Sequence, residues 1–317
     1  MAGPIGICIH GGCGTLDKSL LTPAEWAETR AHLAASLRAA WAVLSKGGKA
    51  LDAVEAAVVV MEDSPHFNAG HGAALTAAST HELDASIMDG ATKGAGAVCT
   101  VKRIRNPIKA ARAVMERSDC VLIAGDAADE FAKRQGLAIV ENSYFTTQRR
   151  LDALASLKRR AESGTLRAAS EAERHGTVGA VALDRAGNLA AATSTGGFNN
   201  KPVGRVGDTP IVGAGTYARN GVVAVSGTGQ GEFFIRNAAA YDIAARMDYG
   251  KHEFKASVDA LVFDVLKSHG IGAGFAAIDA KGQVYAPYNT LGMARGWIGD
   301  DGRLVVATHT EEFAEAA

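Results

Sequence analysis

The stretch His175-Gly-Thr-Val-Gly-Ala-Val-Ala-Leu-Asp184 decides how this chain of 317 residues folds. Residues 178–183 form an apolar run of strand length, and Thr177 stands at its start, directly after Gly176. The segment before it, from about residue 142 to 175, is dominated by charged and polar side chains. A threonine at the start of a strand, after such a segment, is a place where a chain can cut itself.

An N-terminal threonine carries a nucleophile and a base on one residue. Its hydroxyl attacks, while its α-amine, with an ordinary pKa of about 7.7–8.0, accepts the proton near neutral pH. Gly176 has no side chain, so a hydroxyl can approach its carbonyl closely. The sequence therefore predicts cleavage of the Gly176–Thr177 bond into fragments 1–176 and 177–317. Residues 163–175 are expected to be exposed and mobile, as a cleavage site requires.

The composition is typical of a globular enzyme, with 47% apolar and 21% charged residues. A net charge of −1 offers no basic field for nucleic acid. No apolar run approaches the roughly eighteen residues of a membrane span, and the N-terminus lacks the pattern of an export signal. We therefore expect no nucleic-acid or membrane partner and a cytoplasmic location. The cysteines, expected as reduced thiols without CxxC pairing, are Cys8, Cys13, Cys99 and Cys120.

Apolar periodicity and turn signals predict strands in the centre of both halves of the chain and helices outside them. Strands are predicted at about 4–10, 73–76, 85–88, 96–101, 121–124, 178–183, 189–195, 222–226, 274–279, 283–286, 293–298 and 303–308. Helices are predicted at about 22–45, 50–61, 106–118, 127–135, 233–247 and 256–268. Part of the polar segment, 142–175, is also compatible with helix. Neither half alone supplies a complete set of layers, so the two should form one domain.

Short glycine-rich loops follow several of these strands. They are HGGCG (10–14), NAGHG (68–72), STGG (194–197), GRVGD (204–208) and SGTGQGE (226–232). The last has the strand–glycine–helix pattern of a phosphate loop. However, the third glycine of a dinucleotide fingerprint would fall on Glu232, and no GK[ST] follows, so a nucleotide site is not favoured.

These segments, in this order, resemble the plant-type L-asparaginase and isoaspartyl peptidase family of N-terminal nucleophile hydrolases. Further segments that carry the resemblance are FNAGHG (67–72), THELDASIMDG (80–90), NKPVGRVGD (200–208) and AAYDIAARMDYG (239–250). The resemblance extends from residue 5 to about residue 300. It implies an α/β protein folded as a four-layer αββα sandwich, a single domain over 1–317. It also implies self-cleavage and release of L-aspartate from β-aspartyl (isoaspartyl) dipeptides and L-asparagine.

The resemblance assigns catalytic roles to five residues. Thr177 matches the nucleophile, and Thr195 matches a second threonine that orients it. Thr228 and Gly229 match the donors of an oxyanion hole, which stabilise the negative charge that develops on the attacked carbonyl. Asn68 matches a residue that helps to position the nucleophile.

Arg205 and Asp208 match a clamp for the substrate's amino-acid backbone. A guanidinium can hold an α-carboxylate in a bidentate pair, and an aspartate can hold an α-ammonium. The carbonyl of Gly231 stands where it could also accept the ammonium. From residue types alone, RVGD in a loop is more typical of a surface ion pair.

In this family, the loop that carries the residue matching Asn68 surrounds a structural sodium ion, which main-chain oxygens bind. Hard cations take oxygen ligands, and carbonyl groups suffice. The carbonyls expected to bind it here are those of Met61, Glu62, Ser64, Phe67, Ala69 and His71. No organic cofactor is expected.

Three residues depart from this pattern or invite misreading. Cys13 stands where alanine is common, and Gln230 occupies a variable position of the oxyanion turn. His10 is expected to be a strand-end residue, because no second histidine stands at metal-ligand spacing.

Two alternative functions stay open. One is a sibling enzyme, either a glycosylasparaginase or a taspase-like endopeptidase, and the other is a catalytically silent homologue that binds aspartate. The resemblance implies a homo-oligomer, a dimer of cleaved α/β heterodimers. The preference between L-asparagine and isoaspartyl dipeptides is not fixed, because both present the same aspartyl half.

Overall fold

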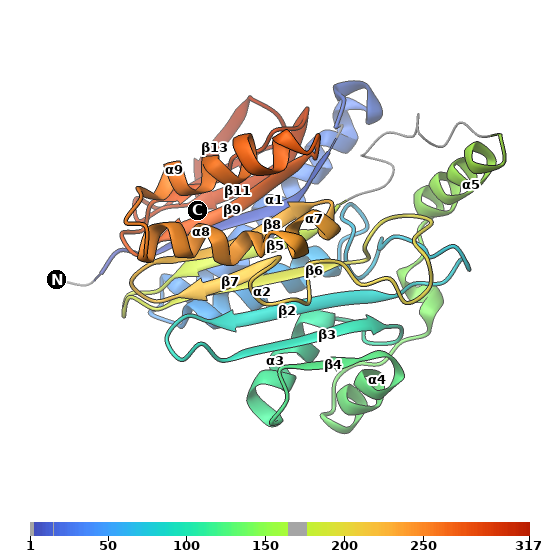
Figure 1. Cartoon of the computed structure of the whole chain (residues 1–317), viewed down its shortest axis with the longest axis horizontal. Coiled ribbons are helices and arrows are strands. Elements are labelled where there is room, and N and C mark those ends of the chain that lie inside the picture. Colours follow the sequence, from blue (N-terminus) through green and yellow to red (C-terminus); the bar gives the residue numbers. More distant parts are fainter. Residues whose placement is uncertain (1–2, 15, 164–175) are drawn as a thin grey trace.

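The computed structural model describes residues 3–14, 16–163 and 176–317, and its centre is formed by two sheets (Figure 1). Among these residues the larger sheet has the order β13 (Glu312–Ala316), β12 (Arg303–Ala307), β11 (Gly292–Ile298), β1 (Gly6–Gly14), β5 (Val178–Leu183), β6 (Leu189–Thr195), β2 (Leu83–Asp89), β3 (Ala95–Val101) and β4 (Leu122–Ala124). The smaller sheet has the order β10 (Val284–Tyr285), β9 (Ala273–Asp279), β8 (Val223–Gly229) and β7 (Thr216–Arg219).

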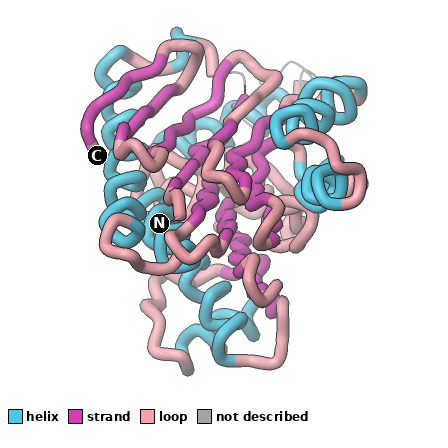
Figure 2. Tube along the Cα trace, turned by 90° about the vertical axis from the view of Figure 1, so that its left-hand side faces the viewer, coloured by secondary structure: helices cyan, strands magenta, loops and turns pink. Residues whose placement is uncertain are grey.

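Helices lie outside the strands, which run through the middle of the molecule (Figure 2). They are α1 (Pro23–Leu44), α2 (Ala50–Glu62), α3 (Pro107–Arg117), α4 (Gly125–Arg134), α5 (Gln148–Glu162), α7 (Gly231–Arg236), α8 (Ala239–Asp248) and α9 (Phe254–Asp259), with the short turns η1 (Lys18–Leu20) and η2 (Asn142–Phe145) and the π-helical segment η4 (Ala260–Leu266). The expected mixed α/β class is confirmed. No helix in the described ranges is long and apolar enough to cross a membrane.

The central strands are buried on both faces, which explains their continuous apolar sequences. Along β1, Ile7 and Ile9 belong to the core shared with α1, α2 and α3, whereas Cys8 belongs to the core shared with the smaller sheet. On its other side the smaller sheet packs against α8, α9 and η4. Helix α1 begins close to the predicted residue 22. Thr22 is its N-cap, Pro23 is the first helical residue, and Glu25 completes a capping box with Thr22.

Strand pairing brings residues from distant parts of the sequence to the predicted cleavage site. Strand β5 lies antiparallel between β1 and β6, with Gly179 opposite His10 and Val178 opposite Ser194. The start of β5 therefore lies beside the end of β6, where Thr195 stands, and beside the glycine loop that ends β1.

Several elements differ from the sequence-based prediction. Residues 73–76 do not form a strand, because Thr76 makes only an isolated bridge with Lys201. The helix predicted over 233–247 is divided into α7 and α8 by Ala238, whose φ of 44° is left-handed. Strands β7 and β13 were not predicted. Helix α5 occupies part of the polar segment, whereas residues 164–175, predicted to be mobile, lie outside the described residues.

Candidate active site

The peptide bond between Gly176 and Thr177 lies at the entrance of β5, and Thr177 is only 7% exposed. The Thr177 hydroxyl is 2.8 Å from the carbonyl oxygen of Gly176 and 3.3 Å from the hydroxyl of Thr195. Thr195 in turn donates to the same Gly176 oxygen at 3.0 Å and accepts from the Gly197 N–H at 3.0 Å. The nucleophile predicted from the sequence therefore touches both the bond that it would cut and the second predicted threonine.

Asn68 also donates to the Gly176 carbonyl oxygen, at 2.7 Å. The second hydrogen of its Nδ2 goes to the Gly197 carbonyl at 2.6 Å, and its Oδ1 accepts from the Ala74 N–H at 2.6 Å. All the polar atoms of this buried side chain are thus occupied, which fixes its orientation. Besides the Thr177 hydroxyl, two donors, Asn68 and Thr195, are aimed at the oxygen that would become negative in an attack of Thr177 on Gly176.

Changing Asn68 to aspartate should therefore slow self-cleavage. Aspartate has nearly the same shape but removes both N–H donors and brings an acceptor to the scissile carbonyl. Loss of one oxyanion donor costs about 10²–10³ in rate. The measurement is the fraction of cut chain against time, followed by intact mass from freshly purified precursor.

Asn199→Asp is the matched control. Asn199 is also buried. Its Oδ1 accepts from the Leu75 N–H at 2.9 Å, but its Nδ2 has no hydrogen-bond partner among the described residues. Aspartate preserves that contact, so this variant should cut much faster than Asn68→Asp. Equal cutting rates in the two variants would remove Asn68 from the cleavage chemistry.

His10 was expected at a strand end, and that prediction is wrong. It lies within β1 and is fully buried, with Nδ1 3.1 Å from the Thr177 carbonyl oxygen and Nε2 2.9 Å from the Ser226 hydroxyl. Burial lowers the pKa of His10 to about 3, so the ring is neutral at pH 7. Because a carbonyl only accepts, Nδ1–H donates to Thr177 and Nε2 accepts from Ser226. His10 therefore holds the main chain of Thr177, the predicted nucleophile.

The predicted oxyanion turn lies against the glycine loop of β1. The Thr228 hydroxyl accepts from the Cys13 N–H at 3.3 Å, and the Cys13 thiol donates to the Thr228 carbonyl at 3.2 Å. The Thr228 hydroxyl oxygen accepts from the Cys13 N–H, so its own proton points away from that group and is free to donate to another acceptor, as an oxyanion donor requires. Gly229 follows at the end of β8.

Glycine is required in the loop next to the scissile bond. Gly12 has a φ of 106°, and a Cβ at this position would lie 3.2 Å from both Gly176 Cα and Thr177 N. A side chain at residue 12 would therefore displace the Gly176–Thr177 peptide bond.

Arg205, Asp208 and Gly231 lie together, as predicted. A Cβ on Gly231 would be 2.6 Å from Asp208 Oδ1 and 3.1 Å from Arg205 Nη2, so only glycine leaves the space between the two charged groups open. Gly197 connects this space to Thr177. A Cβ on Gly197 would lie 3.4 Å from Arg205 Nη1, and its N–H donates to Thr195, which contacts the Thr177 hydroxyl. Whether the Gly231 carbonyl binds an ammonium stays a prediction.

The sequence did not reveal the carboxylate that pairs with Arg205. Glu232 accepts from Arg205 Nε at 3.0 Å and from Nη2 at 2.9 Å, and the guanidinium stacks on Phe198 at 4.7 Å. These contacts fix the guanidinium and direct its Nη1 side toward Gly197. Glu232 directly follows the glycine turn, but nothing in a single sequence indicates a pair across 27 residues.

Asp208 is 6% exposed, and its Oδ2 has no hydrogen-bond partner among the described residues. Burial raises the pKa of this carboxyl to about 7, with Arg205 acting in the opposite direction. A buried carboxylate with an unused oxygen is suited to receive a cationic group, which would restore both its charge balance and its missing hydrogen bond.

The loop predicted to bind sodium offers carbonyl oxygens. Those of Ser64, Phe67, Ala69 and His71 accept no hydrogen bond from any residue that the structure describes. Ser64, Phe67 and Ala69 are buried, where an unused carbonyl is costly unless a cation or water binds it. The remaining two predicted carbonyls, those of Met61 and Glu62, accept from Ser64 N–H at 3.3 Å and His71 N–H at 2.7 Å. The donor set therefore fits a hard cation held by main-chain oxygens.

Comparison with known proteins shows the family to which the chain belongs. The sequence profile of the asparaginase family matches residues 3–307. Over 296 residues the chain is 47% identical to the isoaspartyl peptidase of Escherichia coli strain K12, covering 92% of each chain. Over 294 residues it is 46% identical to the isoaspartyl peptidase of Salmonella typhimurium, covering 92% of this chain and 94% of that one. Over 296 residues it is 41% identical to the isoaspartyl peptidase/L-asparaginase of Xenopus laevis, covering 93% and 92%. The chain therefore belongs to the asparaginase family, as its sequence motifs indicated.

Proposed function

We propose that this protein is a self-cleaving N-terminal threonine amidohydrolase that releases L-aspartate from isoaspartyl dipeptides and L-asparagine. The observation that carries the proposal is the convergence of the Thr177, Thr195 and Asn68 donors on the carbonyl oxygen of Gly176. The names of the bacterial and amphibian relatives support the same activity.

Self-cleavage would begin with attack of the Thr177 hydroxyl oxygen on the Gly176 carbonyl carbon. Asn68 and Thr195 would stabilise the oxyanion. The C–N bond then breaks, the hydroxyl proton passes to the departing Thr177 nitrogen, and an ester joins Gly176 to the Thr177 oxygen. Water hydrolyses the ester, which leaves a carboxylate on Gly176 and a free α-amine on Thr177.

Substrate hydrolysis would use the freed amine as the base. The Thr177 oxygen attacks the side-chain carbonyl of the aspartyl unit, with Thr228 and Gly229 as oxyanion donors. The leaving amine takes the proton and departs, and water then releases aspartate from the acyl-enzyme. Asp208 would hold the substrate ammonium, and the Nη1 side of Arg205 would hold its α-carboxylate.

The test is aspartate release by the processed enzyme from β-aspartyl-leucine, L-asparagine and an N-acetylglucosaminyl-asparagine. We expect release from the first two and little from the third. Preferred hydrolysis of the glycosylated substrate would assign the chain to the sibling glycosylasparaginases. Cutting without release from any of the three would support the silent homologue.

We further propose the four-layer αββα sandwich of N-terminal nucleophile hydrolases, with both fragments in one domain. Support comes from the packing of α1 and α2 on the larger sheet and of α8 and α9 on the smaller one. The two fragments should therefore stay together in native gel filtration. The same run gives the mass that tests a dimer of α/β heterodimers. The cytoplasmic location stays a prediction.

A structural sodium ion is proposed for the loop over residues 61–71, held by the main-chain carbonyls of Met61, Glu62, Ser64, Phe67, Ala69 and His71. Such an ion would hold the loop that carries Asn68 and supply no chemistry of its own. Thermal unfolding in NaCl compared with a bulkier monovalent chloride tests this proposal.

A further inference from the structure

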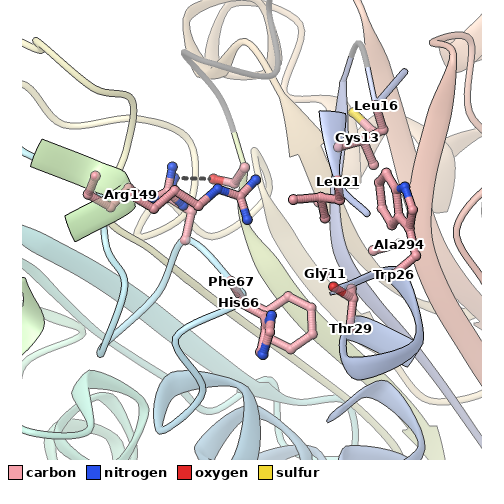
Figure 3. Close-up of a pocket in the computed structure, with 14 residues that line it drawn as sticks. Gly11, Cys13, Leu16, Leu21, Trp26, Thr29, His66, Phe67, Arg149 and Ala294 are labelled. Atoms are coloured by element: carbon pink, nitrogen blue, oxygen red, sulfur yellow. Dashed lines mark hydrogen bonds between the residues drawn. The ribbon is translucent and has the colours of Figure 1, made fainter. Parts of the chain in front are cut away.

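A pocket opens beside the cleavage site, on α1, α5 and the glycine loop of β1 (Figure 3). It shares Asn68 and Gly176 with that site but includes none of Arg205, Asp208 and Gly231. A substrate whose amino-acid head lies in the clamp, with its carbonyl at Thr177, would therefore extend its leaving group into this pocket.

The pocket carries two adjacent cations, Arg149 and Arg150, from the first turn of α5. Arg149 is exposed and makes no ion pair or hydrogen bond with any residue that the structure describes. Arg150 lies deeper and donates Nε to the Gly72 carbonyl at 2.6 Å. Burial and the neighbouring Arg149 charge lower the pKa of Arg150 to about 9, so this side chain is still a cation at pH 7. Burial also lowers the pKa of Arg149, whereas the charge of the Glu25 carboxylate acts in the opposite direction. The described part of the chain thus places two positive charges here without a carboxylate in contact.

Large apolar side chains lie opposite Arg149 in this pocket. Leu21 and Trp26 face Arg149 across it (Figure 3). Leu16, Phe67 and Ala294 also line the pocket, together with the polar side chains of Thr29 and His66. Trp26 is held in place because its indole N–H donates to the Lys18 carbonyl at 3.0 Å. An apolar surface opposite a guanidinium matches an amino acid that has an apolar side chain and a free α-carboxylate.

We infer that this pocket is a subsite for the leaving amino acid of the substrate, with Arg149 binding the free α-carboxylate of that residue. The inference rests on the proposed function and deepens it. It makes isoaspartyl dipeptides with an apolar C-terminal residue the preferred substrates over L-asparagine, whose leaving group is ammonia. Arg149 would act on specificity and takes no part in the chemical step.

A carboxylate in this pocket has a second source, because self-cleavage creates one on Gly176. That carboxylate would be the same for every substrate. A role of Arg149 toward Gly176 would therefore alter all substrates alike, whereas a role toward the leaving residue alters only substrates that carry a terminal carboxylate.

The experiment compares β-aspartyl-leucine with β-aspartyl-leucinamide, which differ only in that carboxylate. Wild type, Arg149→Ala and the control Arg159→Ala are first checked by intact mass for complete cutting. Arg159 lies on the same helix, is exposed and does not line the pocket. We expect the ratio of kcat/KM values, dipeptide over amide, to fall about tenfold in Arg149→Ala and to be preserved in Arg159→Ala. The wild-type ratio should also shrink at high salt, because Arg149 is exposed.

An unchanged ratio in Arg149→Ala, with or without an equal loss on both substrates, would overturn the subsite. A second measurement does not depend on hydrolysis. Titration calorimetry should show N-acetyl-leucine binding to the processed wild type more tightly than N-acetyl-leucinamide, and Arg149→Ala should abolish the difference. Equal binding of the two by the wild type overturns the subsite even if hydrolysis fails. Failure of the wild type to hydrolyse any aspartyl substrate would instead count against the proposed function.

Discussion

Replacing Thr177 by alanine should leave a single uncut chain of 317 residues that releases no measurable aspartate. The substitution removes the hydroxyl that lies 2.8 Å from the Gly176 carbonyl oxygen, so the bond has no internal nucleophile. Without cutting, the nitrogen of residue 177 stays in an amide and cannot serve as the base. Loss of a catalytic nucleophile lowers kcat by more than about 10⁴-fold in comparable hydrolases. Intact mass and an aspartate-release assay measure both effects.

Thr177→Ser is the informative control for this prediction. Serine keeps the hydroxyl and the future α-amine, so this variant should still cut and turn over, at reduced rates. Activity should also rise with pH through the titration of the α-amine, at about pH 7–8. An alanine variant that still produced fragments 1–176 and 177–317, or an uncut chain as active as the processed enzyme, would contradict the mechanism.

The candidate cleavage site, which stays a prediction, can be proposed from the sequence because its signals are local. The apolar run after Thr177, the polar segment before it and the glycine loops all lie in short stretches of chain. The contacts between these stretches in the folded chain, by contrast, cannot be read from local sequence. Asn68 reaches Gly176 across 108 residues and Cys13 reaches Thr228 across 215, and only the pairing order of the strands brings such residues together. The family resemblance, and not the spacing, placed them in one site.

Features that arise from long-range packing were missed. The Arg205–Glu232 pair and the contact of His10 with Thr177 depend on which loops face each other, which residue types do not reveal. The break at Ala238 has no local signal, because alanine is the strongest helix former. The pocket beside Arg149 is built from separate segments, and α5 reaches it only through its packing in the folded chain.

Replacing Asp208 by asparagine should nearly abolish hydrolysis and, at neutral pH, stabilise the protein. The buried carboxylate is the group proposed to hold the substrate ammonium, and removing one partner of such a pair costs about 2–5 kcal/mol. That corresponds to a loss in kcat/KM of roughly thirty- to several-thousandfold. Self-cleavage should continue, because Asp208 has no contact with Gly176 among the hydrogen bonds of the described residues.

The pH dependence of hydrolysis separates this role from a structural one. The raised pKa of Asp208, about 7, means that its carboxyl loses its charge as the pH falls below neutrality. The Thr177 amine gains a proton over a similar range. In the wild type, log kcat/KM should therefore fall with a limiting slope of about two in acid, whereas Asp208→Asn should show a slope of about one.

The effect on stability has the opposite sign, and it follows from the same buried charge. In the unfolded chain Asp208 ionises near its ordinary pKa of 3.8, whereas in the folded chain it ionises near 7 because burial penalises the charged form. The folded state thus binds more protons between these values, so stability falls as the pH rises from about 4 to 7. Asparagine has no charge to bury. Asp208→Asn should gain stability relative to wild type over this window, by at most about 4 kcal/mol, and keep the gain above pH 7.

Asp184→Asn is the control that distinguishes a buried charge kept for function from one kept for structure. Asp184 is as buried as Asp208, but its oxygens accept from the backbone N–H groups of Ala50, Ala186 and Asn188 at 3.0–3.1 Å. Asparagine would replace one of the accepting carboxylate oxygens by an NH₂ group that faces backbone N–H donors. This variant should therefore lose stability at pH 7. Thermal unfolding of both variants from pH 4 to 8 measures the contrast. If Asp208→Asn were also destabilised at pH 7, or hydrolysed β-aspartyl-leucine at the wild-type rate, Asp208 would be a structural residue and the substrate ammonium would bind elsewhere.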